Sequence, residues 1–283
     1  MDIRDSEQRH EMLESLIAVT DFLTPAFSER LKSRLNDKEK LLYEAVEGVT
    51  FAEGNWYRPH HNFIVTASML SLCFWEGLDR NVLMPAAILH DIGYSALKIS
   101  KYGADWNSRD KRIAHMEAGA VMAADILKGT ASMPAEVDGV ERVEEIVEII
   151  RTHDNCYIGE PYETDNQLYH RDADRLYVMS FSSFYKDFLN YLDTGKITSV
   201  EDYLLGRGLS FYNESKEEVV EESGNYKYIP FTLMTAKRLG DEQFRQRTEE
   251  INQGVIDMHP EHFAKYSKDR LLLEADWILS ELS

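Results

Sequence analysis

The sequence predicts an all-α fold, and three observations support this prediction. Apolar residues recur at intervals of three and four through most of the chain, which is the period of an amphipathic helix. Strictly alternating runs rich in Val, Ile and Thr, which are typical of strands, are scarce. The 283 residues are 43% hydrophobic and 29% charged, so the chain has enough apolar side chains to bury a core.

No Pro/Gly/Ser-rich linker, low-complexity tract or internal repeat divides the sequence. We therefore expect a single helical domain over 1–283, with N-terminal helices in 1–57, a core in 58–185 and a C-terminal helical cap in 186–283. The acidic run 214–222 is expected to be a solvated face. The C-terminal region is expected to form a cap or an oligomer contact, for example that of a homodimer.

The net charge of −19 and the pI near 4.9 argue against a nucleic-acid partner, because such a partner needs clustered Lys and Arg to neutralise its phosphates. A small phosphorylated substrate remains compatible with this charge, since a bound divalent metal supplies local positive charge. The sequence therefore favours small-molecule partners.

The two cysteines, Cys73 and Cys156, lack CxxC spacing, which indicates a reducing compartment. The N-terminal residues 1–5 are charged and lack the apolar stretch of a signal peptide. No apolar run is long enough for a membrane span. We expect a soluble, cytoplasmic protein with no membrane partner.

The first half of the chain predicts several helices. Two or three short helices are expected in the first fifty residues, with Thr24-Pro25 as a helix start, because Thr can cap a helix and Pro suits the first helical position. A long helix over 61–77 is expected to end at Gly77. A second helix over 81–90 is expected to stop near Gly93. His90 and Asp91 therefore lie at a helix end.

The stretch 94–107 is expected to be a loop over the site, followed by a helix over 109–127 with His115 on the flank of its apolar face. Gly119 lies one turn after His115. Because glycine weakens a helix, its expected use is the close approach of another backbone or a ligand.

The apolar stripe of the next helix, 140–151, continues to His153, which is therefore expected to point inward. A loop over 155–169 should lead to a helix that begins near Asp172 and places Asp174 on a buried face. A buried carboxylate needs a partner. Further helices are expected over 199–205, 232–239, 241–254 and 268–282.

Several metal-ligand side chains lie on apolar helix faces or at helix ends. A lone inward histidine is more often a core residue than a ligand, but four of them on different predicted helices favour a common site. Imidazole mixed with carboxylate suits one or two divalent transition metals, such as Mn, Fe, Co, Ni or Zn. The candidate metal ligands are His61, His90, Asp91, His115, His153 and Asp174. His60 competes with His61, and Asp172 with Asp174.

One ordered pattern in the sequence resembles a known family. His61 is followed four residues later by Val65, then come Ala-Ala-Ile-Leu-His-Asp-Ile-Gly at 86–93 and Ala-Asp-Arg-Leu at 173–176. This pattern resembles the HD superfamily of metal-dependent phosphohydrolases over about residues 58–185. The resemblance implies an HD-domain helical bundle with additional N- and C-terminal helices.

The resemblance also implies site residues. It favours His61 over His60 and Asp174 over Asp172, which leaves Asp172 as a catalytic or substrate-facing group. One metal would then be held by His61, His90, Asp91 and Asp174.

The segment from His115 to Gly119 resembles the His-x-x-x-Gly signature of HD proteins with two metals, which include the HD-GYP phosphodiesterases and the di-iron HD oxygenases. A second ion would then be held by His115 and His153, with Asp91 as a bridging and catalytic carboxylate. Tyr94 stands where HD-GYP enzymes have Lys, and residues 155–157 replace the Gly-Tyr-Pro motif. A cyclic dinucleotide is therefore not the expected substrate.

The implied function is hydrolysis of a phosphate ester or anhydride in a nucleotide or a similar small metabolite. Lys98 and Arg175 lie nearest the motifs and are expected to bind the substrate, with a plain surface role as the alternative. Two other functions stay open: a di-iron oxygenase that cleaves a C–C or C–P bond, and a non-catalytic nucleotide-binding module. The remaining histidines, His10, His170, His259 and His262, are expected to be exposed, although His170 could face the site.

Overall fold

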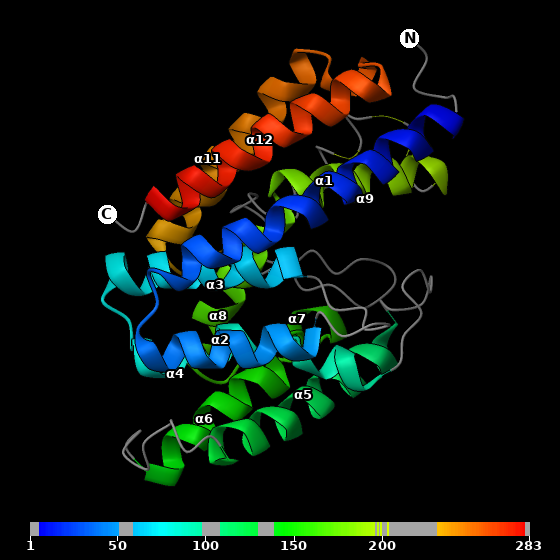
Figure 1. The fold of residues 1–283 in the computed structure, drawn as a ribbon. Helices are drawn as coiled ribbons and strands as arrows, with labels where there is room; N and C mark the ends of the chain where they lie inside the picture. Colours follow the sequence, from blue (N-terminus) through cyan, green and yellow to red (C-terminus); the bar gives the residue numbers. More distant parts are fainter. Residues whose placement is uncertain are drawn as a thin grey trace.

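The computed structural model consists of helices and the turns and loops that join them in the described part of the chain, and no strand occurs there (Figure 1). The all-α prediction is therefore confirmed. None of the helices in the described ranges is long and apolar enough to cross a membrane. The structure describes residues 6–50, 59–97, 108–129, 139–195, 197, 199, 203 and 231–280.

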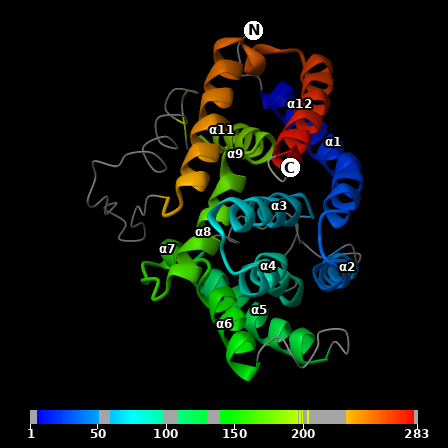
Figure 2. The same ribbon diagram turned by 90° about the vertical axis from the view of Figure 1, so that its left-hand side faces the viewer.

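The centre of the molecule is α3 (Pro59–Glu76), which is buried along almost its whole length. It packs against α4 (Arg80–Leu89) on one side and α8 (Asp165–Val178) on another, while α5 (Arg109–Gly129) and α6 (Gly139–Thr152) pair below α4 (Figure 2). The helices expected over 61–77, 81–90, 109–127 and 140–151 are thus confirmed, with Gly77 at a positive φ of 65° just after α3.

The N-terminal region contains α1 (Ser6–Lys32) and α2 (Asp37–Thr50), and Pro25 lies inside α1. The predicted helix start at Thr24-Pro25 is therefore wrong. The Thr24 hydroxyl donates to the carbonyl of Thr20 at 2.7 Å, one turn back in the same helix, instead of capping a new one. Because α1 packs along α9 (Phe181–Asp193) and α12 (Pro260–Ser280), tertiary contacts outweigh the cost of one missing backbone donor.

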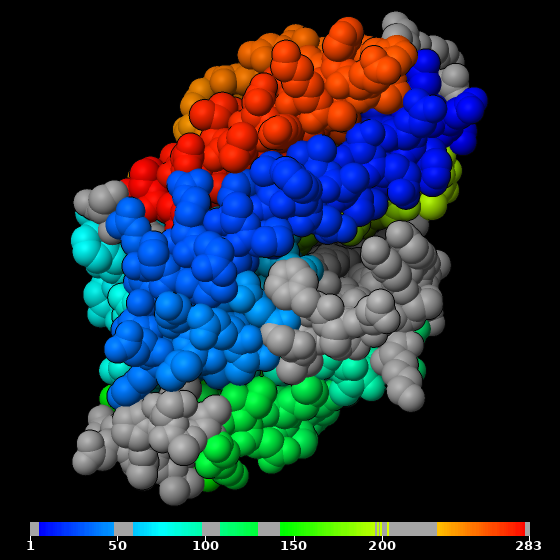
Figure 3. Space-filling model, viewed as in Figure 1, coloured from blue at the N-terminus to red at the C-terminus, as the bar shows by residue number. Residues whose placement is uncertain are grey.

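The C-terminal part adds α9, α11 (Met234–Asn252) and α12 above α3. The helices expected over 232–239 and 241–254 form the single helix α11, since Gly240 is buried inside it and does not end it. The space-filling view shows α12 lying along α1 on one face of the molecule (Figure 3). The helix expected over 199–205 falls mostly outside the described residues.

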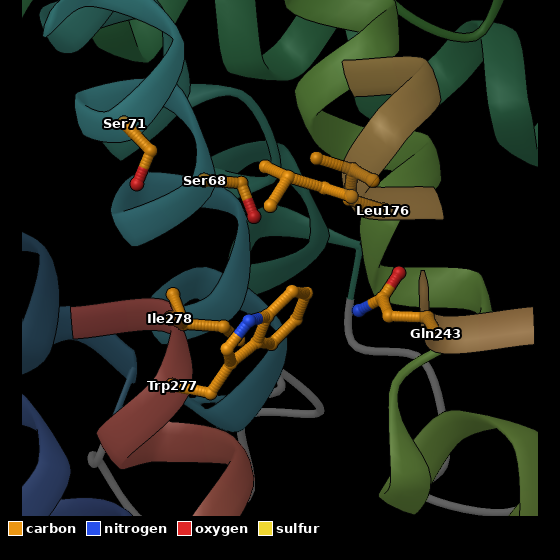
Figure 4. A pocket seen from close by; sticks show the side chains of 7 residues that line it. Ser68, Ser71, Leu176, Gln243, Trp277 and Ile278 are labelled. Atoms are coloured by element: carbon orange, nitrogen blue, oxygen red, sulfur yellow. The ribbon is translucent and has the colours of Figure 1, made fainter. Parts of the chain in front are cut away.

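The C-terminal helices pack closely on the central ones. A cavity of about 10 Å³ lies where α3, α8, α11 and α12 meet (Figure 4), which is room for no more than one water molecule. None of the candidate metal ligands lines it. Its lining residues are Ser68, Ser71, Leu176, Leu239, Gln243, Trp277 and Ile278.

Helix α8 begins earlier than the sequence predicted. It starts at Asp165 after the N-cap residue Thr164, whose side chain accepts from the backbone of Gln167 while the Gln167 side chain accepts from the backbone of Thr164. This reciprocal capping box satisfies two backbone donors. The predicted loop over 155–169 is therefore wrong, because it also contains the short α7 (Asn155–Ile158) and the first turn of α8.

Candidate metal centre

Five helical elements bring the six candidate ligands to one place. His61 lies in the first turn of α3, His90 is the C-cap residue of α4, and Asp91 follows it. The other three come from α5, from the residue after α6 and from α8; they are His115, His153 and Asp174.

The first cluster joins α3, the end of α4 and α8. The Nε2 atom of His61 lies 2.8 Å from Nε2 of His90 and 3.3 Å from Oδ1 of Asp174. The Oδ2 atom of Asp91 lies 3.1 Å from Nε2 of His61 and 3.5 Å from Nε2 of His90. Four side chains thus point ligand atoms at one centre.

The second cluster uses the other oxygen of Asp91. Its Oδ1 atom lies 3.3 Å from Nε2 of His153 and 3.7 Å from Nε2 of His115, and the two imidazole Nε2 atoms lie 3.1 Å apart. One carboxylate therefore faces two clusters, with a different oxygen toward each. This is the geometry of a ligand that bridges two ions.

The hydrogen bonds of the rings leave acceptor atoms facing one another, which is a donor set that could hold a cation. The Nδ1 atoms of His115 and His153 lie 3.2 Å and 2.7 Å from the carbonyls of Lys111 and Ile150, and a carbonyl can only accept. In the neutral rings both Nε2 atoms therefore carry lone pairs, which face each other and Asp91. His90 is fixed the same way by the carbonyl of Ala87 at 2.9 Å. Such a group of acceptors fits a divalent transition metal, because imidazole and carboxylate groups both bind such ions.

The electrostatics agree with the donor set. Burial lowers the pKa of His90, and it lowers the pKa of His115 to about 4, which keeps both imidazoles neutral as metal ligation requires. Burial opposes protonation of His153 too, but the carboxylates of Asp154 and Asp91 outweigh it and raise its pKa to about 9. The two carboxylates thus favour positive charge at this position.

Two glycines let the backbones approach behind the site. A Cβ atom on Gly93 would lie 1.9 Å from the carbonyl oxygen of His115, and one on Gly119 would lie 3.3 Å from the carbonyl of His90. The expected close approach at Gly119 is confirmed. In the same region Tyr94 of η1 (Ile92–Ala96) stacks on His115 with ring centroids 4.0 Å apart, which holds the ring in place.

Sequence reasoning missed Asp154. Its Oδ2 atom accepts from Nη1 of Arg112 at 2.5 Å and lies 3.6 Å from Nε2 of His115, so it borders the second cluster. Burial would raise the pKa of Asp154, but Arg112 together with His153 and His115 outweighs it and the pKa is lowered. The signal was present in the sequence, because residues 153 and 154 form a second His-Asp dipeptide at a helix end.

His170 also lies at the site. The expectation that it is exposed is wrong, because its side chain is fully buried in α8, with its ring centroid 5.3 Å from that of His90. His60 is likewise buried, and its Nδ1 atom lies 3.3 Å from the hydroxyl of Thr24 in α1. Of the adjacent histidines, His61 is the one that points into the cluster.

Asp172 does not reach the clusters. Its Oδ2 atom accepts from the backbone amides of Thr232 and Leu233 at 2.7 and 2.8 Å, and its Oδ1 atom pairs with Arg171. The two amide hydrogen bonds tie α8 to the residues just before α11, and the bond to Arg171 stays within α8. In the structure Asp172 therefore links these segments, and its expected catalytic role stays a prediction.

The two expected substrate-binding residues have different outcomes. Arg175 is half-buried on α8 next to Asp174, and its guanidinium carbon lies 5.9 Å from the ring centroid of Phe231. Lys98 lies outside the described residues. At the cluster itself, only the carboxylates of Asp91 and Asp174 are appreciably exposed, at 14% and 13%.

One comparison with known proteins matches the part of the chain that contains both clusters. No curated protein and no solved structure matches the chain. Residues 60–179 match the family model described as HD domain, and all six clustered ligands fall inside that span. An HD domain implies, in general, an enzyme of the metal-dependent phosphohydrolase type. This chain therefore carries an HD domain, and its two His/Asp clusters are consistent with a binuclear metal site.

Proposed function

We propose that this protein hydrolyses a phosphate ester or anhydride in a nucleotide or a similar small phosphorylated metabolite. The observation that carries the proposal is the placement of Asp91, whose two carboxylate oxygens face two separate pairs of imidazoles at 3.1 to 3.7 Å. Paired divalent ions suit phosphoryl transfer, because they lower the pKa of water and offset charge on the phosphoryl oxygens.

The residues of the chain have separate tasks in this reaction. The first cluster would hold one ion and the second cluster the other, with Asp91 shared between them. Backbone carbonyls at Nδ1 of His90, His115 and His153 fix which nitrogen each ring presents. The partial exposure of Asp91 and Asp174 indicates the side from which a substrate reaches the site.

A rival function is a di-iron oxygenase. The observation that favours it is the ligand set itself, since each cluster pairs two imidazoles with carboxylate oxygens and such a set also suits iron. The bond cleaved would then be C–C or C–P, and dioxygen would be consumed. A third function is that of a non-catalytic nucleotide-binding module. The presence of all six candidate ligands argues against it.

One experiment separates these functions. The full chain is purified anaerobically, its metals are measured by elemental analysis, and it is assayed for phosphate release from nucleotides and aryl phosphates with Mn, Fe, Co, Ni or Zn. We expect metal-activated phosphate release, which Asp91→Ala abolishes and His262→Ala, at an exposed histidine, leaves unchanged. Substrate-dependent oxygen uptake by the iron form would support the oxygenase instead. Nucleotide binding with neither reaction would support the binding module.

A further inference from the structure

His170 is a buried polar group for which the ligand clusters give no role. Its side chain is fully buried, and neither ring nitrogen has a hydrogen-bond partner among the described residues. An imidazole carries at least one N–H in every protonation state. A buried N–H without an acceptor is unfavourable, so an acceptor from outside the described protein atoms is expected at this position.

The position of the ring shows where that acceptor lies. The ring centroid of His170 is 5.3 Å from that of His90, which belongs to the first cluster, and 6.1 Å from that of His153, which belongs to the second. On α8, His170 precedes Asp174 by one helical turn and shares its face. The ring therefore stands beside the junction of the two clusters.

His170 is not a member of either ligand group, since the ligand atoms of each group lie within 4.8 Å of one another and the groups do not include it. It also differs from His60, which is likewise buried and outside both ligand groups but whose Nδ1 atom has the Thr24 hydroxyl as a partner. A core role like that of His60 would give the ring a protein partner. Among the described residues the ring of His170 has no such partner, which leaves its N–H available for a ligand at the junction.

We propose that His170 donates a hydrogen bond to an oxygen atom held between the two clusters, either the oxygen of a water molecule or a phosphoryl oxygen. Both are acceptors of the same chemistry, and a phosphoryl group is especially suited because its oxygens carry negative charge. The inference rests on the proposed function. The inference adds to the proposed function a residue that positions the reacting group without holding a metal.

The test uses the full chain loaded with Co(II), with the variants His170→Leu and His170→Gln. The matched control is His60→Leu, a buried histidine that faces α1. Three quantities are measured: metal ions per chain, the dissociation constant of orthophosphate by calorimetry, and the visible spectrum of the cobalt protein without phosphate. The ion count tests whether His170 is a metal ligand. The dissociation constant tests a hydrogen bond to a phosphoryl oxygen, and the cobalt spectrum tests a hydrogen bond to a water molecule.

We expect both His170 variants to retain two ions per chain. His170→Leu should weaken orthophosphate binding on the order of tenfold, as for the loss of one hydrogen bond to a charged group. His170→Gln keeps a donor and should fall between His170→Leu and the unsubstituted protein. His60→Leu should bind orthophosphate as the unsubstituted protein does. A changed cobalt spectrum with unchanged phosphate affinity would also support the proposal and identify the oxygen as that of water.

Two results would overturn this inference alone: unchanged phosphate affinity and cobalt spectrum in both His170 variants, or loss of metal from both, which would make His170 a ligand or a packing residue. Absence of metal from the unsubstituted protein would overturn the proposed function, and this inference with it. The two failures are therefore distinguishable.

Discussion

Asp91 is the residue that the two clusters of the candidate metal centre share. It follows the helical C-cap residue His90, and its own φ of −97° and ψ of 5° lie in the bridge region, where the chain leaves the helix. Because the backbone turns at this point, two successive side chains can face one centre. In the middle of a helix, successive side chains point about 100° apart. The helix end therefore allows His90 and Asp91 to face the same site.

The shared position of Asp91 predicts unequal effects of two substitutions. Asp91→Ala should remove both ions, because each cluster loses a carboxylate oxygen, whereas His115→Ala should remove only the ion of the second cluster. Helical content should stay close to that of the unsubstituted protein in both variants, since little apolar surface is lost. Elemental analysis and circular dichroism measure these quantities. Retention of two ions by Asp91→Ala would contradict a bridging role.

The buried pair of Arg112 and Asp154 makes a second prediction at this scale. Both side chains are about 7% exposed, and Asp154→Ala would leave the Arg112 guanidinium buried without its carboxylate. We expect the free energy of unfolding to fall by roughly 3 to 5 kcal/mol in the metal-free protein, measured by urea denaturation. The double variant Arg112→Met with Asp154→Leu should recover most of this loss. A double variant as unstable as Asp154→Ala would show that charge burial is not the cause.

At the scale of elements, helix boundaries decided which site residues the sequence could predict. The clustering of the six candidate ligands was predictable, because imidazoles and carboxylates on apolar helix faces stand out from their surroundings. His170 was expected to be exposed, with a place at the site only as the alternative, because a helix beginning near Asp172 leaves residue 170 in a loop. Once the capping box at Thr164 starts α8 at Asp165, His170 and Asp174 are one turn apart on the same face. The wrong expectation that His170 is exposed thus follows from a missed cap.

The packing of η1 on α5 also belongs to this scale and gives a third prediction. In Gly93→Ala the new methyl group would lie 1.9 Å from the carbonyl oxygen of His115 and 2.5 Å from the backbone nitrogen of Gly119. Two backbones must then separate, so we expect a loss of more than about 3 kcal/mol in the free energy of unfolding. Metal affinity should fall as well, because His115 moves with its carbonyl.

The matched control for this prediction is Gly129→Ala, at the end of the same helix α5. A Cβ atom there would meet no described atom within 4 Å, and alanine is the better helix former. The free energy of unfolding of Gly129→Ala should therefore equal or slightly exceed that of the unsubstituted protein. Equal losses in the two variants, measured by thermal and urea unfolding, would show that the contact between η1 and α5 is not tight.

At the scale of the whole molecule, a buried ionic network ties the C-terminal helices together and to the rest. Arg247 of α11 is fully buried, and its Nη2 atom donates to Oε1 of Glu250 at 3.1 Å. Glu274 of α12 accepts at 2.9 Å from the backbone nitrogen of Phe181, the first residue of α9. The Arg247 guanidinium carbon lies 5.2 Å from the ring centroid of Phe181. Helices from three parts of the sequence therefore meet at one charged centre.

This network predicts very different effects for two arginines on α11. Arg247→Met would remove the guanidinium that lies 3.7 Å from Oε1 of Glu274 and pairs with Glu250, which would keep Arg270 at 2.7 Å. Because Glu274 would then stay buried without this cation, we expect the free energy of unfolding to fall by roughly 3 to 5 kcal/mol. Arg245→Met removes a side chain that is 56% exposed and pairs with Glu242 and Glu249 at the surface, where water screens the charges, so little change is expected. Urea denaturation of both variants compares them directly. Because α12 packs on α1, α3 and α9, the loss at Arg247 should also lower the temperature at which the metal centre unfolds. Equal stability of the two variants would mean that the network does not hold the C-terminal helices in place.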